Sequence, residues 1–220
     1  MIIPDEIHRS ARKTLSISVD ATGRLIVRAP LRCSEARILA FIEKKSSWIS
    51  VRQAKAKSEL KLLPNENLDG FSFLLLGKVC EIKKFDKKRA VFDDMSYVLY
   101  VPESATGETV SKWLKKKAKE VFLEMVKVRA RDMQANYKTV AVSTAKKRWG
   151  SCSANNTLRF TFRLLYAPPQ VIDYVIVHEL AHTFYKNHGK MFWKKVESYC
   201  PDWKIKRKWL KDHGYLMQIF

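Results

Sequence analysis

The chain has 220 residues, of which 46% are hydrophobic, so it is long enough for one large domain or two small ones with a real core. Its 42 lysine and arginine residues outnumber 22 aspartate and glutamate residues, and the net charge of +20 favours anionic partners such as nucleic acid, nucleotides or acidic proteins, although charge also serves solubility. The sequence has no run of eighteen apolar residues to span a membrane, no signal-peptide pattern at its start and no C-x-x-C pair, so we expect a cytoplasmic protein with free thiols.

The first hundred residues have the pattern of a small β-rich layer with one helix. Residues 14–19 and 24–29 alternate apolar with polar side chains on either side of a polar turn, which predicts a β-hairpin. Ser34 is a candidate N-cap for a helix that continues to about Leu60. A polar segment around Pro64 follows and separates this helix from the next strands.

The middle of the chain predicts more strand and one long helix. Residues 71–82 have the pattern of a second hairpin, and residues 91–101 supply more strand. Residues 108–137 contain neither proline nor glycine, and their apolar side chains recur at helical spacing. The polar face of this helix is rich in lysine and arginine, which is typical of a solvated face; the alternative is a surface that faces nucleic acid or phosphate.

The last third predicts two strands and three helices. The strands are 140–142 and 158–162, with residues 149–153 in the connection between them. Two prolines then open a helix at its first turn, where proline is tolerated. Further helices are predicted at 189–199 and 202–213.

The helix that begins after these prolines carries His178, Glu179 and His182. Histidines four residues apart lie on one helical face, with Cβ atoms about 5–6 Å apart, so both imidazoles can bind one metal ion. Glu179 projects from a different part of the turn and can reach a water on the metal without being a ligand. This is the His-Glu-x-x-His arrangement of zinc hydrolases, in which the glutamate is the general base.

The apolar flanks of this motif indicate that the helix is buried. Burying two imidazoles and a carboxylate is costly unless they have partners, and a bound cation suits all three groups. The alternative is that backbone groups satisfy two core histidines while Glu179 forms a buried ion pair.

A catalytic zinc ion also needs a third protein ligand. His188 follows His182 by six residues, as the third histidine does in metzincins, but Tyr185 stands where those proteins have a glycine. Residues 186–189 offer a later turn. Glu197, one helix downstream as in gluzincins, is the rival ligand, and a surface histidine at a helix end is the remaining alternative for His188.

The sequence resembles the YgjP-like metallopeptidases, metal-dependent hydrolases related to the SprT and WLM groups. The resemblance covers nearly the whole chain and rests on residues 9–12, 27–30, 45–49, 148–153, 164–168, 172–182, 187–189 and 192–193. It implies that His178, His182 and His188 bind zinc and that Glu179 is the base. Members often have Asn-Trp-Arg-Leu before the active helix, whereas this chain has Thr-Phe-Arg-Leu at 161–164.

We therefore expect an α+β fold in two regions, which could also form one continuous domain. Residues 1–104 would form the β-rich region with one helix, and residues 105–220 a zincin-like, helical metallopeptidase region with a small sheet. The loop at 149–153 is expected to lie at a strand edge facing the metal, where an extended peptide could pair. Four residues are candidates for contacting substrate or supporting a ligand: Arg148, Trp149, Ser151 and Tyr174.

The predicted function is that of a zinc-dependent metallopeptidase with one Zn²⁺ per chain, acting on a peptide or protein substrate. The alternative is a nucleic-acid- or nucleotide-directed phosphohydrolase or binding protein, which the positive charge favours. Three histidines with an adjacent glutamate favour amide hydrolysis, because phosphate hydrolysis more often uses carboxylate-rich or two-metal sites. Candidate contacts for nucleic acid are Lys115, Lys116, Lys119, Lys206, Arg207 and Lys208.

Overall fold

The computed structural model describes residues 2–20, 22–60, 68–86 and 88–220, without the side chains of 57–60. It combines helices with three small sheets, which confirms the predicted α+β class. Contacts within the chain define two compact units, Met1–Leu63 and Pro64–Phe220. The predicted domains, 1–104 and 105–220, place their boundary elsewhere, and that division stays a prediction.

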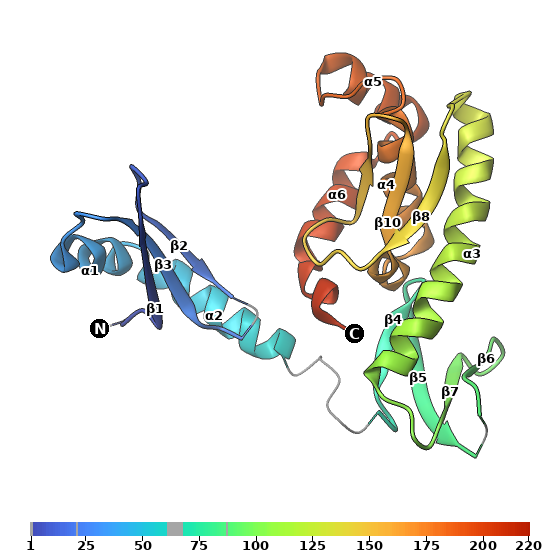
Figure 1. Cartoon of the computed structure of the whole chain (residues 1–220), viewed down its shortest axis with the longest axis horizontal. Helices are drawn as coiled ribbons and strands as arrows, with labels where there is room; N and C mark the ends of the chain where they lie inside the picture. The colour runs from blue at the N-terminus through green and yellow to red at the C-terminus, as the bar shows by residue number, and fades with distance from the viewer. Residues whose placement is uncertain (1, 21, 61–67, 87) are drawn as a thin grey trace. The chain divides into compact units, whose positions relative to one another are not determined.

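The first unit contains a three-stranded sheet and two helices (Figure 1). Its elements are β1 (Glu6–Ser10), β2 (Ser16–Val19), β3 (Leu25–Pro30), α1 (Glu35–Glu43) and α2 (Ser46–Leu60). The strand order is β1-β3-β2. Strands β2 and β3 form the predicted antiparallel hairpin, and β1 pairs parallel to β3. Strand β1 was not predicted, because four of its five residues are exposed and it has no apolar face.

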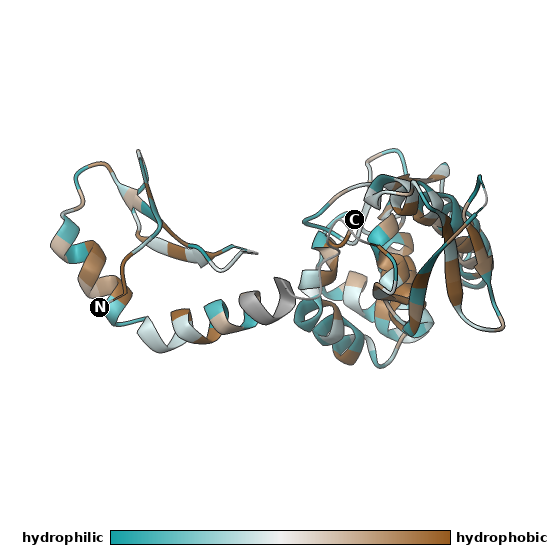
Figure 2. Cartoon of the chain, turned by 90° about the horizontal axis from the view of Figure 1, so that it is seen from below, coloured by the Kyte–Doolittle hydropathy of each residue, from teal (hydrophilic) through white to brown (hydrophobic). Residues whose placement is uncertain are grey.

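One predicted helix of this unit is in fact two helices. Ser34 caps α1 as expected, since its side chain accepts a hydrogen bond from the Arg37 N–H. The expectation that the helix continues to Leu60 was wrong, because the chain turns at residues 44–45. There the Lys45 N–H bonds the carbonyl of Ile42, three residues back, and so interrupts the helical ladder. Hydrophobic residues recur between hydrophilic ones along both helices (Figure 2).

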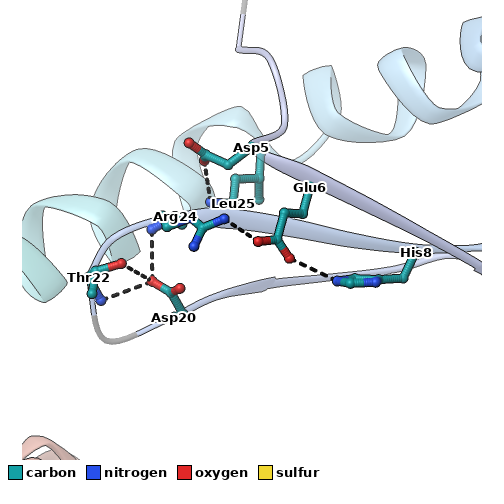
Figure 3. Close-up of polar contacts among 7 residues, drawn as sticks. All are labelled: Asp5, Glu6, His8, Asp20, Thr22, Arg24 and Leu25. Atoms are coloured by element: carbon teal, nitrogen blue, oxygen red, sulfur yellow. Dashed lines mark hydrogen bonds and ion pairs between the residues drawn. The ribbon is translucent and has the colours of Figure 1, made fainter.

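Alternate side chains of β3 form the core of this unit with the helices, namely Leu25, Val27, Ala29, Ile38, Ile42 and Ile49. Polar contacts close the β2–β3 hairpin and hold β1 beside it (Figure 3). Asp20 accepts hydrogen bonds from the Thr22 and Arg24 N–H groups, both at 2.9 Å, which closes the hairpin turn. Glu6 of β1 pairs with both Arg24 and His8.

The second unit begins with a four-stranded sheet of order β4-β5-β7-β6. Its strands are β4 (Ser72–Leu75), β5 (Lys78–Phe85), β6 (Val91–Asp93) and β7 (Val98–Pro102). The predicted β4–β5 hairpin turns at Leu76 and Gly77, whose φ angles are +51° and +78°. A Cβ on Gly77 would lie 2.9 Å from Pro168 Cα, so the glycine lets the hairpin tip pack against the start of the motif helix.

The long helix α3 (Gly107–Met133) buries one face, on Val110, Leu114, Ala118, Phe122, Val126, Ala130 and Met133. It ends earlier than predicted because Gln134 adopts a left-handed backbone, with φ of +53°. Arg129 of this helix forms a two-pronged ion pair with Asp173, at 2.6 and 2.7 Å. This pair ties α3 to the first half of the motif helix.

The sheet beside the motif helix has the order β8-β10-β9, from β8 (Thr139–Ser143), β10 (Thr157–Thr161) and β9 (Gly150–Cys152). Strand β10 pairs parallel to β8 and antiparallel to β9, so β9 is an edge strand. The edge position expected for residues 149–153 is confirmed, but the expectation of a loop there was wrong for residues 150–152, because they pair with β10 as a strand.

Three helices complete the unit: α4 (Pro169–Ala181), α5 (Lys190–Tyr199) and α6 (Trp203–Asp212). Short 3₁₀ segments precede α4 at Phe162–Tyr166 and follow α6 at Gly214–Gln218. Buried Arg163 links the two segments, donating hydrogen bonds to the Thr144 and Ile219 carbonyls at 3.0 and 3.1 Å. Among the described residues, no helix has the length and apolar character needed to cross a bilayer.

Candidate metal centre

The motif histidines lie at the C-terminal end of α4. Pro168 and Pro169 begin the helix, His178 lies in its last turn, and His182 is its C-cap. The chain then turns tightly, because the Thr183 N–H bonds the Leu180 carbonyl at 3.0 Å. This turn allows the following residues to return toward the end of the helix.

Three imidazoles converge at this point. One ring nitrogen from each of His178, His182 and His188 lies within 4.8 Å of the others. The Nε2 atoms of His178 and His188 are 3.0 Å apart. Within the described residues, these three histidines form the group of side chains that could bind a metal ion. Glu197, the rival third ligand, is exposed and does not belong to this group.

The donor set fits a zinc ion. Two nitrogen ligands of a tetrahedral zinc ion lie roughly 3.3 Å apart, close to the observed separation of the two Nε2 atoms. The Nδ1 atom of His182 lies 2.9 Å from the Tyr185 carbonyl, so a hydrogen there directs the Nε2 lone pair to the centre. The Nδ1 atom of His178 is buried without a hydrogen-bond partner among the described groups, so backbone contacts do not satisfy this histidine.

Burial sets the protonation of the centre. It lowers the pKa of His178 to about 3, and the neighbouring histidines and Arg207 act in the same direction. Burial also lowers the pKa of His182, against the effect of its bond to Tyr185. Neutral imidazole is the form that binds a metal, so both rings are ready to act as ligands without losing a proton.

Glu179 lies beside this group and is only 6% exposed. Burial raises the pKa of its carboxyl to about 8, and the charge of Arg148 opposes that change. Among the described residues, only the charge of Arg148 acts on this carboxyl, and no hydrogen bond or ion pair to it is formed. The buried ion pair considered from the sequence is therefore not formed within the described chain.

Aromatic side chains of α5 and α6 surround the imidazoles. Buried Phe192 has its ring centre 4.9, 4.5 and 4.7 Å from those of His178, His182 and His188. Trp193 stacks on His188 at 5.7 Å and on Trp203 at 4.2 Å. These contacts restrict the ring of His188, which is otherwise exposed at the surface.

Gly150 of edge strand β9 lies directly against Glu179. A Cβ on Gly150 would lie 2.7 Å from Glu179 Oε1 and 2.8 Å from its Cγ, closer than real Cβ contacts. The absent side chain therefore makes room for the carboxylate. The sequence placed this glycine in a loop near the metal but did not reveal the contact.

A cavity of about 320 Å³ adjoins Glu179 and His178. Its other lining residues are Trp149, Gly150, Tyr174, Val175, Arg207, Leu210 and Lys211. Of the four candidates for substrate or ligand support, Trp149 and Tyr174 line this cavity, whereas exposed Arg148 and half-buried Ser151 do not. Of the three lining residues from α6, Arg207 was proposed only as a nucleic-acid contact, and Leu210 and Lys211 were missed, because only the fold brings that helix to the motif.

A helix with two histidines and a glutamate, joined by a third histidine from the following turn, defines a candidate metal-dependent hydrolase. The chain belongs to the YgjP-like metallopeptidase family: a model of the YgjP-like metallopeptidase domain matches residues 13–213. This confirms the resemblance drawn from the sequence and makes the chain a member of a metal-dependent peptidase family.

Comparison with solved structures found the metallopeptidase zymogen jannalysin of Methanocaldococcus jannaschii. The match has 22% sequence identity and a TM-score of 0.35, and covers 40% of this chain and 93% of jannalysin. Comparison with curated proteins found no match. The roles of individual residues therefore rest on the geometry of this chain.

Proposed function

We propose that the protein is a zinc-dependent peptidase in which His178, His182 and His188 hold the ion and Glu179 is the general base. The observation that carries the proposal is the convergence of three imidazole nitrogens beside a buried carboxylate that has no ion-pair partner among the described residues. Zinc bound by three histidines would lower the pKa of its water to about 7 and polarise a substrate carbonyl.

The chain's own residues supply the proton transfer. Glu179 accepts a proton from the attacking water and passes it to the leaving nitrogen of the peptide bond. Burial raises the pKa of the Glu179 carboxyl to about 8 in the metal-free chain, and a cation bound beside it would oppose that rise and favour the ionised, basic form. Because Gly150 has no side chain, it leaves room for the Glu179 carboxylate.

Strand β9 is the proposed platform for the substrate. It is an edge strand of the β8-β10-β9 sheet, and its first residue contacts Glu179. An extended peptide can add to such an edge through backbone hydrogen bonds. Its side chains would then reach the adjoining cavity, where Trp149 and Tyr174 are candidate contacts.

Two observations favour amide hydrolysis over the phosphohydrolase alternative. The candidate metal group in the described chain consists of histidines, with no carboxylate-rich cluster beside it. Of the six cations proposed for nucleic acid, Lys206 and Lys208 pair with Asp202 and Asp212, which reduces their availability for phosphate. Binding of nucleic acid by the basic surface stays a prediction.

Replacing the base tests this function. Glu179→Gln keeps the size and polarity of the side chain but removes its basicity. The variant should retain zinc and lose peptide hydrolysis by a factor on the order of 10² or more. A Glu179→Gln protein that binds zinc and cleaves peptides as fast as the wild-type protein would show that another group activates the water.

A further inference from the structure

Two basic side chains of α6 line the cavity beside the candidate metal centre. Arg207 and Lys211 are four residues apart and therefore lie on the same face of the helix. The guanidinium of Arg207 lies 5.5 Å from the ring centre of Trp193, the tryptophan that stacks on His188. Arg207 thus packs against a tryptophan that itself contacts one of the three imidazoles.

These two cations differ from their neighbours on the helix. Lys206 pairs with Asp202 at 2.8 Å, and Lys208 pairs with Asp212 at 2.6 Å. Within the described ranges, no carboxylate forms an ion pair with Arg207 or Lys211. The acidic side chain in the cavity lining is Glu179, so the lining carries two cations against one carboxyl.

The remaining lining is suited to the stem of a side chain. Val175 and Leu210 are buried apolar residues, and Trp149 adds an aromatic surface. A volume of about 320 Å³ is at the lower end of the range for small-molecule sites, which is enough for a few atoms of aliphatic chain ending in a charged group. The cavity thus combines apolar walls with two cations that lack a carboxylate partner.

The cationic surface continues outside this cavity. A neighbouring hollow is lined by Trp203, Lys204, Arg207, Lys208, Lys211 and Asp212, so Arg207 and Lys211 border both spaces. An anionic group that leaves the cavity would therefore meet further positive charge along α6. The arrangement favours substrates that carry negative charge on this side of the scissile bond.

We propose that the substrate presents a carboxylate to Arg207 and Lys211 while its scissile bond lies against Glu179. This inference rests on the proposed peptidase function and adds a substrate class to it. The carboxylate belongs to an acidic side chain or to the free C-terminus of a peptide, and the guanidinium of Arg207 can bind either through two parallel hydrogen bonds. Arg207 and Lys211 are then specificity residues rather than members of the catalytic group.

The test measures binding, so that it does not depend on turnover. The probes are fluorescent peptides of one sequence: a blocked peptide with Glu, a blocked peptide with Gln in its place, and the Gln peptide with a free C-terminal carboxylate. They are titrated against full-length Glu179→Gln protein at physiological ionic strength, which screens the general attraction of a +20 chain. The Glu position is varied along the peptide.

Two double variants in the same background identify the residues. Arg207→Gln/Lys211→Gln removes the cavity cations, and Lys204→Gln/Lys208→Gln removes equal charge from the same helix without altering that lining. We expect at least one carboxylate peptide to bind about tenfold more tightly than the blocked Gln peptide, as for a charged hydrogen-bonded pair. The ratio of the affinities of the carboxylate peptide and the blocked Gln peptide should fall to near one in the first double variant and stay unchanged in the second.

Equal affinity for all three peptides, or no binding, would overturn the inference, as would equal losses in both double variants. An oligothymidylate whose binding depends on Arg207 and Lys211, without a carboxylate preference among the peptides, would assign these cations to phosphate instead. Zinc content and the effect of Glu179→Gln on hydrolysis are measured independently of these binding results. Failure of the carboxylate preference can therefore be distinguished from failure of the proposed peptidase function. A preference for the free C-terminus alone would identify the chain end as the carboxylate.

Discussion

Gly150 and Glu179 are packed so closely that a Cβ on the glycine would lie 2.7 Å from the Glu179 carboxyl oxygen. The contact joins the edge strand to the motif helix, and it leaves no room for even a methyl group. We therefore expect Gly150→Ala to displace the carboxylate while leaving the histidines in place. Hydrolysis should fall on the order of 10²-fold, as for a lost general base, with zinc content unchanged.

Ser151→Ala is the matched control for this substitution, since Ser151 is in the same strand but outside the cavity lining. Activity assays with parallel metal analysis separate the two effects. Full activity in the Gly150→Ala protein would mean that the Glu179 side chain can move aside without loss of function.

A second prediction concerns the third ligand. His188 converges with His178 and His182, whereas Glu197 is exposed outside the group. His188→Ala should weaken zinc affinity by more than the roughly 10–100-fold that loss of a supporting outer-shell partner costs, and Glu197→Ala should have little effect. Competition titrations with a chromophoric chelator measure both affinities. The reverse order would assign the third position to Glu197.

A third prediction concerns the ion pair that ties α3 to α4. Arg129 contacts Asp173 at 2.6 and 2.7 Å, and the Asp173 side chain is only 17% exposed. Asp173→Asn should lower the free energy of unfolding by about 1–3 kcal/mol, because the guanidinium loses a charged, partly buried partner. Urea denaturation measures this change.

Asp132 provides the control, because it lies 3.7 Å from Arg129 and its side chain is 40% exposed. Such exposed pairs contribute about 0–1 kcal/mol, so Asp132→Asn should destabilise the protein less. Equal losses in the two variants would show that the contact between α3 and α4 does not depend on the two-pronged geometry.

The fourth prediction concerns the pH dependence of the metal-free protein. Burial lowers the pKa of His178 from 6.5 to about 3 and raises the pKa of Glu179 from 4.5 to about 8. As the pH falls from 6.5 toward 3, His178 takes up a proton in the unfolded chain but not yet in the folded chain, so the free energy of unfolding decreases. As the pH rises from 4.5 toward 8, Glu179 loses its proton in the unfolded chain but not yet in the folded chain, so the free energy of unfolding again decreases.

Glu179→Gln abolishes only the effect of the carboxyl. With a chelator present, the melting temperature of this variant relative to the wild-type protein should therefore rise as the pH increases from about 5 to 8. Thermal melts across this range measure the difference. A difference that stays constant would show that the carboxyl of Glu179 ionises normally in the folded protein.

The sequence was sufficient for features that depend on local pattern. The β2–β3 hairpin follows from alternation, and α3 follows from helical spacing over residues after Gly107 that include neither proline nor glycine. The convergence of His188 with the motif histidines was also predicted, since only a short turn separates it from His182. These features depend on neighbours a few residues apart.

Features that depend on distant neighbours were not predicted. Strand β1 has no apolar alternation and forms through pairing with β3, and the break between α1 and α2 has no proline or glycine to mark it. The contact of Gly150 with Glu179 joins a strand to a helix. The positions of Arg207 and Lys211 follow from the packing of α6 against α4, which no local pattern encodes.

Metal analysis of the full chain, purified without chelator, tests whether the three histidines bind zinc. We expect about one zinc ion per chain in the wild-type and Glu179→Gln proteins, and none in His182→Ala. Circular dichroism of each sample confirms that the chain is folded when its metal is measured. A folded wild-type protein that takes up no zinc at micromolar concentrations would show that His178, His182 and His188 do not form a zinc site.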